Sequence, residues 1–270
     1  MRVYEIPEGS KTSKGRAIQN LINIEQDDKV KAFINTQDLK DEEYINSHCV
    51  IMATKQGQIK KTSLEQYSRP RANGINAITV KDGDELLEAK LTNGESEILI
   101  AVKSGKAIRF EESKTRPMGR NASGVRGITL NGPNDAVVGM VSVNDLDTDI
   151  LVVSANGYGK RSRLEDYRAT NRGGKGVKTI SVTEKTGELV SIKNVSDEND
   201  LMIINKSGIA IRMSVDSLRV MGRATQGVKL INLKGDDSIA AVAKVMKEEE
   251  TIEDQTLEGE ENATDGTNIE

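Results

Sequence analysis

Four stretches of the chain combine glycine with lysine and arginine in a way that suits the binding of phosphate. They are residues 69–74 (RPRANG), 116–127 (RPMGRNASGVRG), 171–176 (NRGGKG) and 221–227 (MGRATQG). Glycine-rich backbone lets an anion approach main-chain N–H groups closely, and the cationic side chains add favourable charge. One such loop could serve solubility alone. Four loops that recur in phase favour contact with a phosphate backbone.

The candidate DNA contacts are the cations in and beside these loops. They are Arg69, Arg71, Arg116, Arg120, Arg126, Lys160, Arg161, Arg172, Lys175, Arg219 and Arg223. The accompanying loop glycines are Gly119, Gly124, Gly127, Gly173, Gly174, Gly176, Gly222 and Gly227. With five Tyr, two Phe and no Trp, the chain has no aromatic platform for stacking bases, and it has no zinc-finger spacing. Binding to duplex DNA is therefore expected to be largely independent of sequence, with any preference set by how easily the DNA bends.

The residues that catalysis or metal binding would need are missing. No G-x-x-x-x-G-K-[ST] motif occurs, and the chain has a single histidine, His48, and a single cysteine, Cys49. Acidic clusters such as residues 82–85 favour turn formation over a metal site, since Asp side chains bond their own backbone in turns. We therefore predict no catalytic residue, no metal and no cofactor on this chain.

A repeat of about fifty residues positions the loops. Its turn glycines are Gly57, Gly105, Gly157 and Gly208, and the differences between their numbers are 48, 52 and 51. Each glycine separates a Val- and Ile-rich run from a second run that ends in basic residues, which is the pattern of a β-hairpin. A basic glycine loop, another short β-like run, an acidic turn and a fourth run then follow.

Four strands in fifty residues match one blade of a propeller. Residues 2–6 and 13–16 fit only the second hairpin strand and the basic loop of a unit. The sequence thus predicts an all-β domain over residues 1–247, with four whole four-stranded blades and a partial N-terminal blade. Helix is expected only at turns such as residues 64–67 and 164–167.

Charge divides the chain into a basic body and an acidic tail. The net charge is −4, and residues 248–270 hold ten acidic and no basic residues, so residues 1–247 carry −4 + 10 = +6. We predict that this tail is disordered, because it has too little apolar surface to offset the entropy of ordering. It could keep the protein soluble, or it could mimic DNA and compete for the basic body. No apolar run is long enough to span a membrane, so a soluble cytoplasmic protein is expected.

Several of these segments resemble a known family. They are residues 156–161 (NGYGKR), 118–128 (MGRNASGVRGI), 220–228 (VMGRATQGV) and 82–86 (DGDEL). Together they resemble the C-terminal domain of the DNA gyrase A protein, a β-pinwheel that wraps DNA. The resemblance runs from residue 1 to about residue 245, and the acidic tail also fits the family.

The resemblance implies a six-bladed domain, of which this chain carries four repeats and a half. The family's Q-R-R-G-G-[KR]-G box belongs to a first blade that is missing here, although residues 170–176 match its last five positions. It also implies that the DNA-cleaving tyrosine lies elsewhere in the gyrase A protein and that the ATPase lies in the gyrase B protein. The implied partners are double-stranded DNA, the remainder of the gyrase A protein and the gyrase B protein, and the implied location is the chromosome in the cytoplasm.

The function expected on this basis is non-catalytic. The chain would bend and wrap duplex DNA around a basic rim so that gyrase can introduce negative supercoils. An alternative within the family is the corresponding domain of topoisomerase IV, which would recognise DNA geometry. An alternative of another class is a propeller-like protein-interaction module without DNA affinity.

Overall fold

The computed structural model describes residues 2–10, 12–22, 24, 28–71 and 73–247. The predicted acidic tail, residues 248–270, lies outside the described residues, so its disorder stays a prediction. Short Val- and Ile-rich runs separated by glycine turns form antiparallel strands, as the alternation of residue types predicts. The fold is all-β, in agreement with the sequence analysis.

The strands form four successive sheets. The first contains β1 (Cys49–Thr54), β2 (Gln58–Ser63), β3 (Leu86–Thr92) and β6 (Val125–Arg126). The second contains β4 (Glu97–Val102), β5 (Lys106–Glu111), β7 (Val137–Val143) and β10 (Val177–Lys178). The third contains β8 (Asp149–Ser154), β9 (Tyr158–Arg163), β11 (Leu189–Val195) and β14 (Val228–Lys229). The fourth contains β12 (Asn199–Asn205), β13 (Ala210–Ser214) and β15 (Ile239–Met246).

Each four-stranded sheet takes its outermost strand from the following repeat. β6 lies near the end of the next basic loop in the chain, and β10 and β14 directly follow theirs, yet these strands pair with β2, β5 and β9. We call β6, β10 and β14 the rim strands. This exchange differs from the prediction that each fifty-residue unit builds a blade of its own. The local sequence indicates that a two-residue segment can adopt a β conformation. It does not indicate which edge of which sheet the segment will pair with.

Three glycines make this exchange possible. Gly124, Gly176 and Gly227 directly precede the rim strands and have φ values of +88°, +70° and +84°. A Cβ on any of them would lie 2.5 Å from a carbonyl oxygen of the neighbouring strand, which real Cβ atoms do not tolerate. Only glycine combines the left-handed backbone with this close approach.

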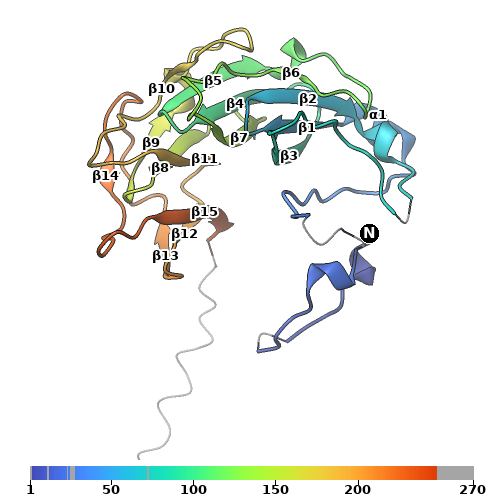
Figure 1. Ribbon diagram of the computed structural model, residues 1–270, viewed down its shortest axis with the longest axis horizontal. Helices are drawn as coiled ribbons and strands as arrows, with labels where there is room; N and C mark the ends of the chain where they lie inside the picture. Colours follow the sequence, from blue (N-terminus) through green and yellow to red (C-terminus); the bar gives the residue numbers. More distant parts are fainter. Residues whose placement is uncertain (1, 11, 23, 25–27, 72, 248–270) are drawn as a thin grey trace, which may run out of the picture.

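The hydrophobic core lies between adjacent sheets. Ile51 and Ile100 share the cluster between the first and second sheets, while Leu99 and Val152 share the one between the second and third. A third cluster, including Val153 and Leu201, joins the third and fourth sheets. Figure 1 shows the sheets following one another around an arc, with β3, β7, β11 and β15 on its inner side and the rim strands on its outer side.

The N-terminal part of the chain differs from the sequence prediction. Among the described residues before β1 there is no strand, and the predicted strand at residues 2–6 is instead the 3-10 turn η1 (Val3–Glu5), with η2 (Ile18–Asn20) after it. The backbone bonds close within that turn, because the amide of Glu5 donates to the carbonyl of Arg2 at 3.0 Å. A strand needs a neighbour to pair its backbone groups, and none of the described residues supplies one here.

Among the residues that the structure describes, helix is confined to short pieces. The 3-10 turns η3 (Leu64–Tyr67) and η5 (Leu164–Asp166) lie where they were expected, and η4 (Glu112–Lys114) lies between them in the chain. The helix α1 (Glu42–Ser47) was not predicted, although the carboxylate of Asp41 caps its first turn by accepting from the amide of Tyr44 at 3.1 Å. In the described part of the chain, no helix combines the length and the apolar character needed to cross a membrane.

Candidate nucleic-acid interface

Three of the four basic glycine loops, residues 116–127, 171–176 and 221–227, lie on the outer side of the arc, because each contains or leads directly into a rim strand (Figure 1). The repeat therefore brings equivalent loop positions to the outer edge of successive sheets. The cations there fall into three groups according to their place in the repeat.

The first group lies at the start of each of the last three loops or a few residues before it, and its members are exposed. Arg116, Arg168 and Arg219 occupy equivalent positions, each four residues before the first central arginine of its loop. We call these three residues the loop row. Arg168 was missed in the sequence analysis, although its spacing from Arg172 equals that of Arg116 from Arg120 and of Arg219 from Arg223.

The second group lies on the rim strands. Arg126, Lys178 and Lys229 are each the second and last residue of their strand, and all three are exposed. We call them the strand row. Lys178 and Lys229 were also missed, because the candidate contacts stopped at the loops. The signal that could have found them is a cation two residues after the glycine that precedes each rim strand, Gly124, Gly176 or Gly227.

The third group joins neighbouring loops. Arg120, Arg172 and Arg223, which we call the clamp arginines, are half-buried. Each donates from Nη1 to a carbonyl at the same position of the preceding repeat, namely Asn76 (3.4 Å), Arg126 (3.1 Å) and Lys178 (2.7 Å), respectively.

Two of the clamp arginines make a second bond to the main chain. The Nε atom of Arg172 donates to the carbonyl of Lys114 at 3.0 Å, and that of Arg223 donates to the carbonyl of Asp166 at 2.9 Å. These guanidinium groups therefore join the loop of one repeat to the backbone of the preceding repeat. Because a guanidinium has five N–H donors, each group has further donors that could bind a ligand.

Two of the predicted DNA contacts are buried in the structure. Lys160 and Arg161 have relative exposures of 1% and 7%. The guanidinium of Arg161 pairs with the carboxylate of Asp149 and, at 2.5 Å, with that of Asp197. A duplex outside the protein cannot reach side chains held in this way, so we exclude both residues from the interface.

The cation at the position of Arg161 forms an ion pair in every sheet, although its acidic partner is not always at the same position. Lys61 pairs with Glu112 at 2.8 Å, Arg109 pairs with Glu97, and Arg212 pairs with Asp200 at 2.8 Å. The basic residues at the end of each hairpin therefore stabilise the fold. Sequence alone presented them as exposed because a strand that ends in lysine and arginine normally faces water.

The other predicted cations remain accessible. Arg69, Arg71 and Lys175 are exposed. The first loop is two residues shorter than the others. This is seen when the distance along the chain from Tyr67 to Gly74 is compared with that from Tyr167 to Gly176. Arg69 and Arg71 therefore have no strict counterparts in the later repeats.

The remaining loop glycines have different surroundings. Gly173 has a φ of +83°, and a Cβ on Gly127 would lie 2.8 Å from Cδ1 of Ile100. Nothing lies within 4 Å of a Cβ on Gly119 or Gly222, and only Ile108 Cδ1, at 3.5 Å, lies near one on Gly174. At these last three positions the protein leaves room for a phosphate to approach the backbone.

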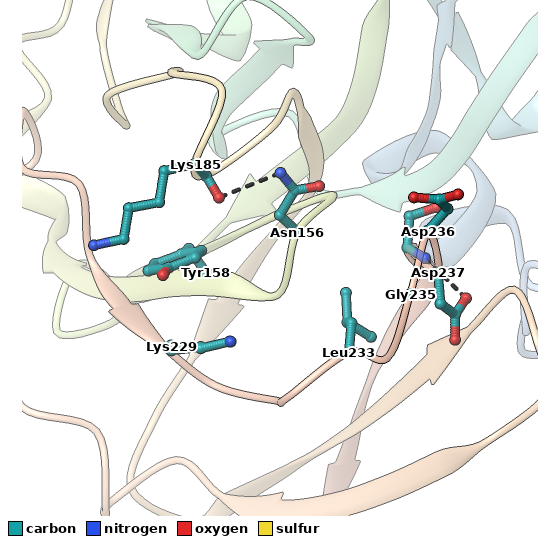
Figure 2. Close-up of a pocket in the computed structure, with 9 residues that line it drawn as sticks. Asn156, Tyr158, Lys185, Lys229, Leu233, Gly235, Asp236 and Asp237 are labelled. Carbon is teal, nitrogen blue, oxygen red and sulfur yellow. Dashed lines mark hydrogen bonds between the residues drawn. The ribbon is translucent and has the colours of Figure 1, made fainter.

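The end of the third sheet carries additional charge (Figure 2). Lys229 of the strand row pairs in register with Tyr158, and the Nζ atom of Lys185 lies 5.5 Å from the centre of the Tyr158 ring. Asp236 and Asp237 line the opposite side of this shallow pocket. Lys185 thus adds an exposed cation beside Lys229, while the aspartates limit how far an anion could extend.

The single histidine and cysteine have structural surroundings. His48 Nδ1 lies 2.9 Å from the carbonyl of Tyr44 and 3.0 Å from Oγ of Ser47. Burial raises the pKa of the Cys49 thiol, which makes it a poorer nucleophile at neutral pH. Across the described residues, no group of three His, Cys, Asp or Glu side chains could hold a metal ion.

The sequence matches the family described as the DNA gyrase C-terminal domain, beta-propeller. The matched residues are 1–37, 50–93, 96–144, 148–196 and 199–246, which correspond to five repeats. The N-terminal segment is therefore recognised as part of a repeat even though its described residues contain no strand.

Similar proteins include the gyrase A protein of Staphylococcus aureus (strain NCTC 8325 / PS 47). It is 43% identical over 273 residues, covering 99% of this chain and 30% of the relative, so the chain spans under a third of that protein's length. Among solved structures, the C-terminal domain of DNA topoisomerase IV has a TM-score of 0.81 at 23% identity, covering 90% of this chain and 74% of the other. A DNA gyrase A C-terminal domain has a TM-score of 0.76 at 24% identity, covering 91% and 78%.

Proposed function

We propose that this chain, which belongs to the DNA gyrase C-terminal domain family, is a non-catalytic domain that binds duplex DNA along its outer rim and bends it around the arc of sheets. The observation that carries the proposal is the recurrence of exposed cations at equivalent rim positions. The loop row and the strand row each place one cation on three successive rim segments.

A curved line of cations suits a duplex backbone. Double-stranded DNA carries about one negative charge per 1.7 Å of helix axis, so a duplex that follows the rim can meet both rows repeatedly. The energy of these contacts offsets the cost of bending the duplex. Because the rim offers strands and loops with no recognition helix among the described residues, we expect phosphate contacts to dominate and sequence to matter little.

We further propose that the chain acts within a DNA gyrase. The 43% identity to a gyrase A protein favours gyrase over topoisomerase IV, since the structural likenesses below 25% identity support the fold alone. The gyrase B protein and the remainder of the gyrase A protein would be its partners, and negative supercoiling in the bacterial cytoplasm would be the outcome. In this proposal the DNA-cleaving tyrosine and the ATPase belong to other parts of that assembly, and this chain uses no cofactor.

The salt dependence of duplex binding tests the DNA-binding part of the proposal. If the six residues of the two rows each neutralise a phosphate, log K should fall linearly with log salt concentration with a slope of about −5. Fluorescence anisotropy with a long duplex, repeated with an unrelated sequence of equal length, measures this slope. A protein-interaction module would give no salt-dependent affinity, and a strong difference between the two sequences would contradict phosphate-dominated binding.

A further inference from the structure

Two of the rim loops rest on buried lysines. Lys60 in β2 and Lys160 in β9 occupy the same position of the repeat, and their relative exposures are 0% and 1%. Among the described residues no carboxylate forms an ion pair with either ammonium. A buried cation is costly unless hydrogen bonds satisfy it, so the partners of these lysines are informative.

The partners are main-chain carbonyls of the loops above. Lys160 Nζ donates to the carbonyls of Gly222 (2.8 Å) and Arg223 and to the hydroxyl of Thr225 (3.2 Å). Lys60 Nζ donates to the carbonyl of Ala77 (2.6 Å) and to that of Arg120. In both cases the ammonium fixes the backbone of a clamp arginine.

The second sheet has a different arrangement. Ile108 replaces the lysine there, and its Cδ1 atom lies close under Gly174 of the N-R-G-G-K-G loop. That loop is supported from another side, because Thr129 donates from its amide to the Gly174 carbonyl (2.9 Å) and from its hydroxyl to the Gly173 carbonyl (2.6 Å). The residue below the loop thus varies with the loop's sequence, with lysine under both M-G-R-x-x-x-G loops and isoleucine under the glycine-rich one.

We propose that Lys60 and Lys160 are positioning residues for DNA binding, whose buried ammonium groups hold Arg120 and Arg223 in the conformation that faces the duplex. This inference rests on the proposed function of the rim. An ammonium has three N–H donors, which match the three acceptors around Lys160. A neutral amine has two donors, and its lone pair would face an acceptor oxygen, so loss of the proton loosens the loop.

The charges around the two lysines set the pH range of this effect. Burial, together with Arg223 and Lys178, lowers the pKa of Lys160 to about 8, while Asp166 opposes the shift. Burial lowers the pKa of Lys60 as well, with Arg120 contributing. A bound phosphate backbone would favour the charged form of both lysines. Duplex affinity should therefore be constant below about pH 8 and fall as the pH rises through that value.

Folding stability has the opposite dependence on pH. Because the pKa of Lys160 is lower in the folded chain than in the unfolded one, the unfolded chain binds more protons above about pH 8. The contribution of this group to stability therefore increases as the pH rises from about 8 to about 10.4. A role limited to folding would make stability and DNA binding change together, whereas a positioning role makes them change in opposite directions.

The experiment compares the pH profiles of duplex affinity from about pH 7 to pH 9.5 at fixed ionic strength. For the wild-type chain we expect a loss of about three- to tenfold above pH 8, since a difference of one pKa unit between free and bound states corresponds to a tenfold change. The double variant Lys60→Met, Lys160→Met should bind about tenfold more weakly at pH 7 and show a smaller pH-dependent loss than the wild type. Ile108→Met is the matched control, and it should keep both the wild-type affinity and the wild-type profile.

The outcomes separate this inference from the proposed function. A flat wild-type profile, or a double variant whose profile parallels the wild type, overturns the positioning role. Failure of the wild-type chain to bind duplex at any pH would instead overturn the proposed function. If thermal unfolding shows that the double variant does not fold, the same comparison of pH profiles is made between Lys160→Met alone and the wild type, and its result decides whether the positioning role holds.

Discussion

Replacing Arg126, Lys178 and Lys229 together with glutamine is expected to weaken duplex binding by about 10² to 10³-fold at 0.1 M salt. Each cation that neutralises a phosphate releases a counterion, which at this salt concentration is equivalent to about an eightfold gain in affinity. The salt slope should become shallower by about 2.7 for the same reason. The three side chains are exposed, so the temperature of unfolding should change little.

A matched variant separates the rim from the overall charge. Lys90, Lys193 and Lys244 lie on the inner strands β3, β11 and β15, and replacing them with glutamine removes the same net charge. This inner variant should bind nearly as well as the wild type. Equal losses for the two triple variants would mean that only net charge matters and would contradict an interface on the outer side of the arc.

The second large effect concerns stability. Arg161→Met should lower the free energy of unfolding by about 3–5 kcal/mol, because it leaves the carboxylate of Asp149 buried without its main partner. Asp149 itself is only 3% exposed. Urea unfolding measures the loss, and duplex affinity measured below the new unfolding transition should stay close to that of the wild type.

Arg163→Met is the control for this variant. Arg163 lies on the same strand, and its exposed guanidinium is 3.4 Å from the other oxygen of Asp149. Because the guanidinium of Arg163 is exposed to solvent, we expect its longer contact with Asp149 to contribute at most about 1 kcal/mol, so the control should unfold almost like the wild type. If Arg161→Met kept its stability and lost duplex affinity instead, Arg161 would be a DNA contact, as the sequence first suggested.

The comparison of sequence and structure separates local from non-local information. The hairpins were predictable because the runs around Gly57, Gly105 and Gly157 carry their own turn signal and their own apolar pattern. The exchange of rim strands was not, since β6 and β10 are two residues long and their partners lie more than sixty residues earlier in the chain. Only the tertiary structure decides which edge such a short strand joins.

The same distinction applies to the cations. A cation on a loop, such as Arg116, is exposed in the structure as its context predicts. Arg161, at the end of a hairpin, was misjudged, because one of its partners is Asp197, which lies far from it along the chain. Lys61, at the same position of the first hairpin, pairs with Glu112 of the following repeat. Burial of such a pair depends on contacts that no local pattern specifies.

Plasmid topology is the most direct test of whether the rim bends duplex DNA in a defined direction. A closed circular plasmid is relaxed by a separate nicking-closing enzyme with and without this chain, at low and high salt. If the rim wraps DNA, we expect a shift in linking number that grows with the amount of chain bound and disappears as salt releases the chain. The variant in which Arg126, Lys178 and Lys229 are replaced with glutamine should not produce this shift. Binding of the chain to the plasmid without any shift in linking number would contradict wrapping.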